Sequence, residues 1–388
     1  MSESNQPTPD PALRLALVIT ELGVGGAEKC VALLAQGIRR HQLHPQVFSL
    51  APPPPAGQDR LVRDLESAGV PVHFVHVQRP QQLLRAVGTL TRLLRQMRPH
   101  VLQSFLFHAN VVSALAARRA RVQRTFAGLR VAEPAAWRWR LLRLVAPRFE
   151  QFVCVSQSVA EFVAAQGLAE SKMTVIPNAV NVQQMRDRPA ADLRSLGIAS
   201  ERRVILCVAR LDRQKGVDWL LEQIAMVFQQ LPDFDLVLAG AGPQLESICQ
   251  YVNKNPWRDR VHLLGQRDDV PELMKASDLV VLPSRWEGMS NVLLEAMACR
   301  RPVVAHRVHG VAEVLGQLAD QQTVEPGHPT DFVQQIVSLC SNRELATHLG
   351  EANCRRIEQH YTIDRLCAAY AQLYRTTDQC HLNRPGNK

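Results

Sequence analysis

The sequence predicts an α/β protein in which two Rossmann-like domains face each other across an interdomain cleft. Short apolar runs alternate with amphipathic helical stretches in the first half of the chain, and the alternation restarts after a polar segment at 181–200. Such alternation is typical of parallel sheets covered by helices on both faces. The length of 388 residues suits two domains of about 150–200 residues each.

The first half of the chain contains a series of expected strands and helices. LRLALVI at 13–19 has the length and apolarity of a buried parallel strand, and the glycine-rich turn GVGGAE follows it at 23–28. An amphipathic helix is expected from Lys29 to Arg40, and a second helix at 81–97 ends before Pro99. Further strands are expected at 46–52, 71–77, 100–107, 152–156 and 173–180.

The second half repeats this pattern. Helices are expected at about 217–230 and from near Asn291. Strands are expected at 204–210, 235–240, 261–265, 278–284 and 301–306. The predicted organisation is a disordered tail at 1–12, an N-terminal domain at 13–185, a linker at 186–200, a C-terminal domain at 201–355, and a helix at 356–376 that packs back toward the N-terminal domain.

Charge and cysteine usage limit the classes of function. The net charge is +9, and residues 79–148 hold fourteen arginines, no lysine and one acid, Glu133. This basic region is either a solvated surface or a surface for anionic lipid headgroups or an anionic acceptor. Nucleic acid is not favoured, because no helix-turn-helix, RRM or zinc-finger pattern is present. The nine scattered cysteines without a C-x-x-C pair indicate free thiols in a reducing compartment.

Cellular location and membrane contact are also predicted. No run approaches the roughly 18 apolar residues of a membrane span, and the polar, proline-rich start lacks the pattern of a signal peptide. We therefore expect a cytoplasmic protein, either free or peripheral on the inner face of the membrane. In the segment 131–149, tryptophans and leucines are interleaved with arginines. On a helix, the apolar stripe would face either an anionic membrane surface or the domain core.

Two segments of the second half carry the candidate chemistry. Arg210 and Lys215 follow an expected strand, where they could grip a diphosphate, and Gly216 lets the chain turn into the next helix. An ordinary charged surface loop would show the same spacing. In SRWEGMSNVLLEAMA at 284–298, Glu287 precedes a helix N-terminus that could bind phosphate, and Glu295 lies on its first turns. Ser290 or Asn291 could also serve as a simple cap.

Together these segments resemble the family 4, or group 1, retaining glycosyltransferases, which have the GT-B fold. The resemblance covers nearly the whole chain in order. It rests on GVGGAE (23–28), VIPNAV (175–180), VARLDRQKGVDWLL (208–221), LVLAGAGPQ (236–244), SRWEGMSNVLLEAMA (284–298) and HGVAEVL (309–315). Ala179 and His309 depart from the family pattern, which has glycine at both positions.

The resemblance implies a role for each matching residue. The N-terminal domain would bind the acceptor and the C-terminal domain the nucleotide sugar. Arg210 and Lys215 would stabilise the departing diphosphate without a metal, and Glu287 would hold the donor sugar. The donor would also contact Gly25, Gly26, Gly288, Met289, Ser290, Asn291 and Glu295, the last through ribose hydroxyls. His108 would contact the transferred sugar or the acceptor hydroxyl, and Arg130 is a weaker candidate for acceptor or phosphate contact.

The implied reaction transfers a hexose or N-acetylhexosamine from a nucleoside diphosphate sugar, weakly favoured as UDP-linked, to a glycan or lipid-linked acceptor in polysaccharide or glycoconjugate synthesis. No metal site or cofactor is expected, and the adjacent Asp268 and Asp269 are interpreted as a loop. The alternatives are a GT-B sugar-nucleotide epimerase, a non-catalytic sugar-nucleotide-binding protein and a nicotinamide dehydrogenase. The dehydrogenase is disfavoured because GVGGAE lacks the third glycine or alanine and no acid ends the second strand.

Overall fold

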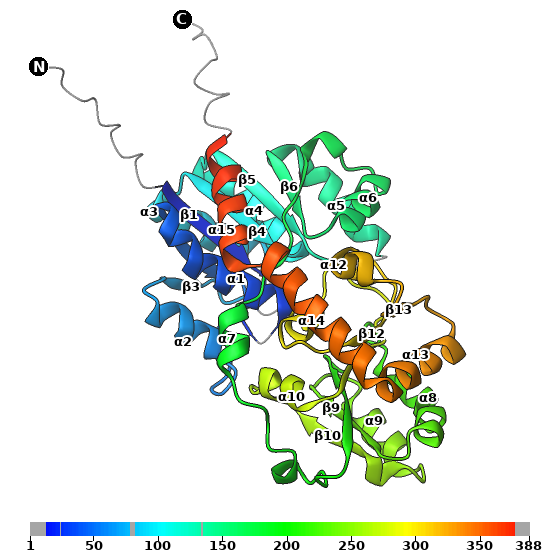
Figure 1. Cartoon of the computed structure of the whole chain (residues 1–388). Coiled ribbons are helices and arrows are strands. Elements are labelled where there is room, and N and C mark those ends of the chain that lie inside the picture. The colour runs from blue at the N-terminus through cyan, green and yellow to red at the C-terminus, as the bar shows by residue number, and fades with distance from the viewer. Residues whose placement is uncertain (1–12, 24, 78–81, 133–134, 377–388) are drawn as a thin grey trace, which may run out of the picture.

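The computed structural model describes residues 13–23, 25–77, 82–132 and 135–376, so the predicted tail at 1–12 lies outside the described residues. The described chain forms two α/β domains, each built on a parallel sheet (Figure 1). The two-domain fold predicted from the alternation is confirmed.

The N-terminal sheet has seven strands within the described residues, in the order β3-β2-β1-β4-β5-β6-β7. The strands are β1 (Leu13–Ile19), β2 (Leu43–Ser49), β3 (Val72–Phe74), β4 (Val101–Phe105), β5 (Arg124–Leu129), β6 (Gln151–Cys154) and β7 (Met173–Val175). The helices are α1 (Gly26–Gly37), α2 (Arg60–Ser67), α3 (Leu83–Met97), α4 (Phe107–Ala120), α5 (Ala136–Val145), α6 (Gln157–Ala165) and α7 (Val182–Asp187).

The C-terminal sheet has six strands in the described chain, in the order β10-β9-β8-β11-β12-β13. The strands are β8 (Arg203–Val208), β9 (Phe234–Ala239), β10 (Val261–Gly265), β11 (Leu279–Leu282), β12 (Val303–His306) and β13 (Thr323–Val324). The helices are α8 (Val217–Gln230), α9 (Leu245–Asn253), α10 (Val270–Ala276), α11 (Asn291–Ala298), α12 (Val311–Leu315), α13 (Pro329–Ser341), α14 (Arg343–His360) and α15 (Ile363–Thr376).

Strand order places a topological switch point in each sheet. The chain builds β1, β2 and β3 in one direction and then returns to add β4 on the other side of β1. The C-terminal sheet does the same with β8 and β11. Ligands of open α/β sheets bind at the carboxyl ends of the strands that flank such a point. The loops after β1, β4, β8 and β11 are therefore the expected site.

Strand β5 was absent from the sequence prediction. It begins with Arg124, a residue that seldom opens a central strand, and Gly128 interrupts its apolar pattern. Arg124 is nevertheless buried, because its guanidinium pairs with Glu150 and donates to the carbonyl oxygens of Leu373 and Tyr374 in α15. An arginine with all these partners can remain in a core position.

The end of the chain crosses from one domain to the other. The boundary predicted at 356 falls inside α14, which continues to His360, and a separate helix, α15, follows. Buried Tyr370 and Tyr374 of α15 belong to the same apolar cluster as β1 and α1, and Figure 1 shows this helix lying on the N-terminal domain. Val180 bridges Thr362, so the two chain crossings between the domains run side by side.

Helix α5 settles how the apolar stripe of segment 131–149 is used. Trp139, Leu142 and Val145 are buried in the domain core, whereas Trp137 and Leu144 are exposed. The core therefore takes one side of the helix, and part of the stripe remains outside it. No helix among the described residues has the length and apolarity to cross a membrane.

Candidate active site

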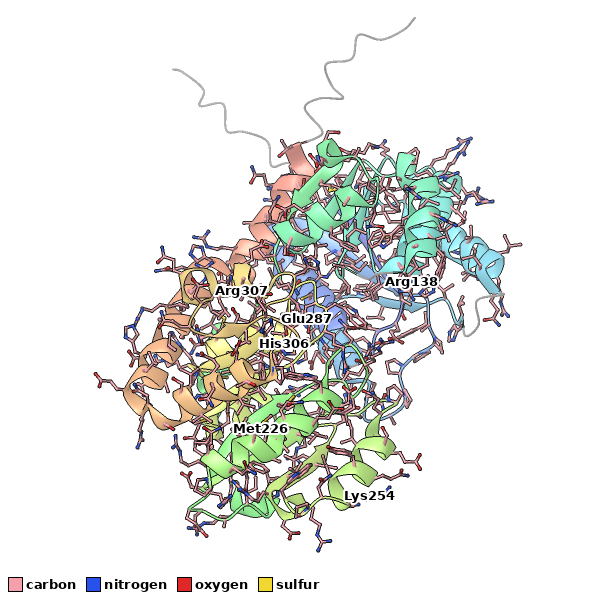
Figure 2. All side chains as sticks on the ribbon, turned by 90° about the vertical axis from the view of Figure 1, so that its right-hand side faces the viewer. Arg138, Met226, Lys254, Glu287, His306 and Arg307 are labelled. Carbon is pink, nitrogen blue, oxygen red and sulfur yellow. The ribbon has the colours of Figure 1, made fainter. Side chains whose placement is uncertain are left out.

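Most of the predicted site residues lie at the switch points of the two sheets, whereas Arg130 follows β5 and Glu295 lies within α11. Gly25 and Gly26 follow β1, His108 follows β4, Arg210 and Lys215 follow β8, and Glu287 follows β11. A cavity of about 670 Å³, the cleft cavity, lies between the domains and is lined by His108 and Arg130 on one side and Arg210 and Trp286 on the other. Figure 2 shows Glu287 close to the junction of the two domains.

Lys215 and Glu287 form a short ion pair in the C-terminal half of the site. Lys215 Nζ lies 2.6 Å from Glu287 Oε1, and Ser284 Oγ donates to the same oxygen at 2.8 Å. Glu287 is only 5% exposed. Lys215, which is expected to bind the diphosphate, therefore also orients the carboxylate of Glu287, which is expected to bind the sugar.

The turn at Gly216 explains why these residues meet. Its φ of 66° lies in the left-handed region, and a Cβ there would come within 2.1 Å of the Pro283 carbonyl oxygen. Only glycine allows this approach. The loop that carries Lys215 therefore lies directly against the end of β11, and the segment that follows β11 contains Ser284 and Glu287.

Arg210 has a different environment from Lys215. Its side chain is 65% exposed and pairs with Asp212, which also accepts a hydrogen bond from the backbone N–H of Lys215. The guanidinium lines the cleft cavity. It is placed to attract an anion that enters from solvent.

His306 contacts the loop that contains Ser284. It is buried at the end of β12, with Nδ1 3.2 Å from the Ser284 carbonyl oxygen, and it packs edge-on against Trp219 and Phe332. Burial lowers the pKa of His306, which favours the neutral ring. Its role is to hold the Ser284 loop in place.

The N-terminus of α11 is packed against the N-terminal domain. Ser290 caps the helix by accepting from the Leu293 N–H, and Asn291 Nδ2 donates to the Gly26 carbonyl oxygen at 2.6 Å. A Cβ on Gly288 would lie 2.0 Å from the Arg130 carbonyl oxygen, so this position requires glycine. Met289, the remaining residue of the predicted segment, is buried. Segments more than 100 residues apart thus meet at the expected phosphate site.

Glu295 faces a second cavity, of about 480 Å³, which also lies between the domains. Its Oε1 is 2.9 Å from Lys29 Nζ of α1, and the carboxylate raises the pKa of Lys29. Arg60 and Arg267 also line this cavity. Glu295, which is expected to bind the ribose, therefore has a cationic partner, Lys29, from the other domain.

His108 is exposed at the start of α4 and lines the cleft cavity. Leu106, two residues earlier, has φ 72° and ψ 160°, a region that costs a non-glycine residue about 1–3 kcal/mol. Two other histidines of this domain have partners of their own: His73 stacks on Phe48, and His100 accepts from the Arg14 N–H. The strained turn supports a functional role for His108.

Arg130 is buried rather than open to an acceptor. It lies over the Phe105 ring, with its Cζ 5.8 Å from the centroid, and donates to Asn178 Oδ1. Asn178 also donates to Asn291 Oδ1 at 2.8 Å. Arg130 borders the cleft cavity, and Asn178 links it to Asn291 of the other domain.

Glu28 is a further candidate beside Gly25 that was not among the predicted site residues. It lies in the first turn of α1, is 6% exposed, and would contact any Cβ added to Gly25. Burial raises its pKa to about 7, and Glu21 contributes, while Arg130 and Arg210 act in the opposite direction. The sequence signal that could have identified Glu28 is an acidic residue in the first helical turn after a glycine-rich loop.

A second missed residue is Glu313 of α12. Its carboxylate accepts from the backbone N–H groups of Gln157 and Ser158, at 2.8 and 3.3 Å. These groups form the N-terminus of α6 in the other domain, where a carboxylate is favoured. The HGVAEVL segment thus joins the domains.

The two departures from the family pattern fit their surroundings. The His309 ring packs against Phe162 of α6, with centroids 5.7 Å apart, so it adds an interdomain contact. Ala179 is buried and is absent from the described residues with positive φ. Its backbone therefore does not need glycine.

The sequence contains one Asp-x-Asp pattern, Asp233-Phe234-Asp235, of the kind that metal-dependent transferases use. It lies at the amino end of β9, away from the carboxyl ends that form the cleft. Buried Asp235 is bound by Arg202 at 2.6 Å and His262 at 2.9 Å. The pattern therefore has a structural role.

The fold and the cleft define the class: two facing Rossmann-like domains with cations, carboxylates and a helix N-terminus at their switch points form a GT-B protein. The model of Glycosyltransferase Family 4 matches residues 24–184, and the model of Glycosyl transferases group 1 matches residues 202–342. The chain belongs to this glycosyltransferase family.

Similar proteins agree with this assignment. The N-acetyl-alpha-D-glucosaminyl L-malate synthase of Bacillus anthracis is 30% identical over 181 residues, 47% of each chain. The N,N'-diacetylbacillosaminyl-diphospho-undecaprenol alpha-1,3-N-acetylgalactosaminyltransferase of Campylobacter jejuni is 26% identical over 354 residues, 85% of this chain and 90% of that one. The chain spans about half the length of the first curated relatives that it matches.

Among solved structures, Anabaena HepE in complex with UDP and glucose has a TM-score of 0.81 at 21% identity, over 94% of this chain and 100% of that one. Sucrose-phosphate synthase of Thermosynechococcus elongatus has a TM-score of 0.75 at 18% identity, over 95% of this chain and 100% of that one. At these identities the likeness establishes the GT-B fold.

Proposed function

We propose that this protein is a retaining, metal-independent glycosyltransferase. It transfers a hexose or N-acetylhexosamine from a nucleoside diphosphate sugar to a glycan or lipid-linked acceptor. The observation that carries the proposal is the convergence of Arg210, Lys215 and Glu287 at the switch point of the C-terminal sheet, opposite His108. The family assignment supports the reaction class, and the resemblance implies retention.

The chemistry follows from charge. As the bond to the anomeric carbon breaks, negative charge develops on the leaving diphosphate. Arg210, Lys215 and the N–H groups before α11 are cations and donors fixed in place, so they stabilise that charge without reorganising. Two side-chain cations supply the positive charge that a metal ion would otherwise provide, which is the support for metal independence.

The remaining groups orient the substrates. Glu287 holds the donor sugar, while Glu295 accepts ribose hydroxyls beside Lys29. His108 approaches from the opposite domain, where the acceptor hydroxyl must lie. A uridine diphosphate donor is favoured weakly, in line with the ligand named for the Anabaena structure.

The acceptor class is supported by relatives. The Campylobacter protein is named for a diphospho-undecaprenol acceptor, whereas the Bacillus protein is named for L-malate. A location in the cytoplasm, either free or on the inner face of the membrane, would give the protein access to nucleotide sugars and to both kinds of acceptor. The arginine-rich surface of the N-terminal domain fits an anionic acceptor.

A thermal-shift screen with UDP, GDP, UDP-sugars and GDP-sugars tests this function. We expect one nucleotide class to raise the melting temperature of the wild type, and Arg210→Ala to reduce the shift. NAD⁺, which a dehydrogenase would bind, serves as the control. A response to NAD⁺ and to no nucleotide sugar would overturn the proposal.

A further inference from the structure

A third cavity, of about 660 Å³, extends from the cleft into the N-terminal domain. We name it the apolar groove; its walls include Pro52–Pro55, Val77, Leu83, Val111, Trp137 and Leu141. It shares Thr20, Glu21, Phe107 and His108 with the cleft cavity. The groove is therefore continuous with the proposed active site at His108.

The polarity of the groove changes along its length. Among the described residues that line it, the ionisable side chains are Glu21 and His108, and both also line the cleft cavity. Pro52–Pro55 form part of the remaining wall; proline has a fixed φ and no backbone N–H. This wall is stiff and offers no donors. Sugar hydroxyls would lose water there without replacement partners, whereas a hydrocarbon chain would gain by leaving water.

We infer that the apolar groove binds a hydrocarbon chain of the acceptor, joined through phosphate to the group whose hydroxyl reacts at His108. The inference rests on the proposed function and deepens it, because it chooses a lipid-linked acceptor over a free glycan. The chain occupies the proline-walled part of the groove, and the reacting hydroxyl reaches the cleft cavity.

The mouth of the groove fits an amphiphilic ligand. Leu83 is 39% and Trp137 is 57% exposed at its rim, although large apolar side chains are usually covered in soluble domains. The Arg138 guanidinium lies 5.2 Å from the Phe107 ring centroid and lines the cleft cavity. This cation, where the groove joins the cleft cavity, complements a phosphate between the chain and the reacting group.

Alkyl phosphates below their critical micelle concentration test the inference by calorimetric titration. Decyl phosphate should bind wild-type protein more tightly than hexyl phosphate, and methyl phosphate should bind least. Each added methylene should tighten binding by about fourfold until the groove is filled. Equal affinity for methyl and decyl phosphate would overturn the inference.

Matched leucine variants separate the groove from general surface adsorption. Leu83 and Leu141 line the groove; Leu84 and Leu144, on the same two helices, are 81% and 72% exposed and lie outside its lining. We expect Leu83→Gln and Leu141→Gln each to weaken decyl phosphate binding at least tenfold. Leu84→Gln and Leu144→Gln should change it less than twofold.

The thermal shift produced by UDP is measured on the same four variants. An unchanged shift shows that each variant is folded and binds donor, so loss of decyl phosphate reports on the groove alone. If Leu84→Gln and Leu144→Gln weaken binding as much as the groove variants, the amphiphile binds the surface and the inference fails. Leu83→Gln, at the exposed rim, keeps the test valid if Leu141→Gln does not fold. Absence of a shift with both UDP and GDP in the wild type would instead contradict the proposed function.

Discussion

Lys29 of the N-terminal domain and Glu295 of the C-terminal domain form an ion pair across the cleft, with Nζ and Oε1 2.9 Å apart. The carboxylate is nearly buried, while the lysine is partly exposed. Lys29 binds one oxygen of the carboxylate, which leaves the second oxygen for the ribose that we propose Glu295 binds. In that case the pair would connect the domain contact with nucleotide binding.

Substitution of these two residues should separate their roles. Glu295→Gln is expected to weaken UDP binding at least tenfold, because a charge-assisted hydrogen bond to the ribose is lost. Lys29→Met should weaken it by about threefold, since Glu295 then loses its orienting partner. Calorimetry with 2′,3′-dideoxy-UDP is the control: its affinity should not respond to Glu295→Gln. Tighter UDP binding by Lys29→Met would mean that the lysine competes with the ribose.

The two cations that follow β8 should differ in their effect on stability. Arg210→Ala and Lys215→Ala are each expected to lower kcat by about 10²-fold at saturating donor, because each removes a charge that stabilises the leaving group. Lys215→Ala should also lower the free energy of unfolding by about 1–3 kcal/mol, since Glu287 is left buried without its cation. Arg210 is exposed, so Arg210→Ala should leave that free energy unchanged.

Turnover and urea unfolding measured together check this pair. Wild-type turnover in both variants would show that neither residue acts in the proposed active site.

Excess EDTA in the same turnover assay should leave the wild-type rate nearly unchanged. A rate that EDTA abolishes and manganese restores would contradict metal independence.

The fold and the cations could be predicted because each depends on local pattern. Arg210, Lys215 and Glu287 lie where apolar strands end, so strand periodicity alone places them at one edge of a sheet. Contacts between domains carry no such signal: Asn178 meets Asn291, and Glu313 meets the N-terminus of α6, across more than 100 residues. Strand β5 was missed because Arg124 is buried through partners in α15 that local sequence cannot show.

Glu28 should make stability depend on pH. Its pKa is about 7 in the folded protein, against 4.5 for an unperturbed glutamate, so the folded state binds more protons than the unfolded state between these pH values. Stability should therefore decline as the pH rises from about 4.5 to 7 and then level off, by a total on the order of 3 kcal/mol. Glu28→Gln should remove this decline. Urea unfolding at pH 5 and pH 8 checks it, and parallel pH profiles for wild type and variant would contradict it.

The basic face of α5 should bind anionic membranes weakly. Arg140 and Arg143 are exposed, and each headgroup-proximal arginine contributes about 1 kcal/mol. We expect co-sedimentation with phosphatidylserine vesicles at low salt, reduced at least tenfold by the double change Arg140→Gln and Arg143→Gln. Exposed Arg258 and Arg355 of the C-terminal domain provide the matched double control. Equal sedimentation with neutral vesicles would mean that this face is only a solvated surface.

Release of free nucleoside diphosphate from a panel of UDP- and GDP-sugars tests the central claim most directly. The assay includes decyl-phosphate-linked sugars as acceptors and compares the wild type with Arg210→Ala. We expect the wild type to release free nucleoside diphosphate from at least one donor, and Arg210→Ala to slow this release about 10²-fold. Conversion of a donor into a different nucleotide sugar without release would indicate an epimerase, and no turnover of any donor would indicate a binding protein. Either result would contradict the account.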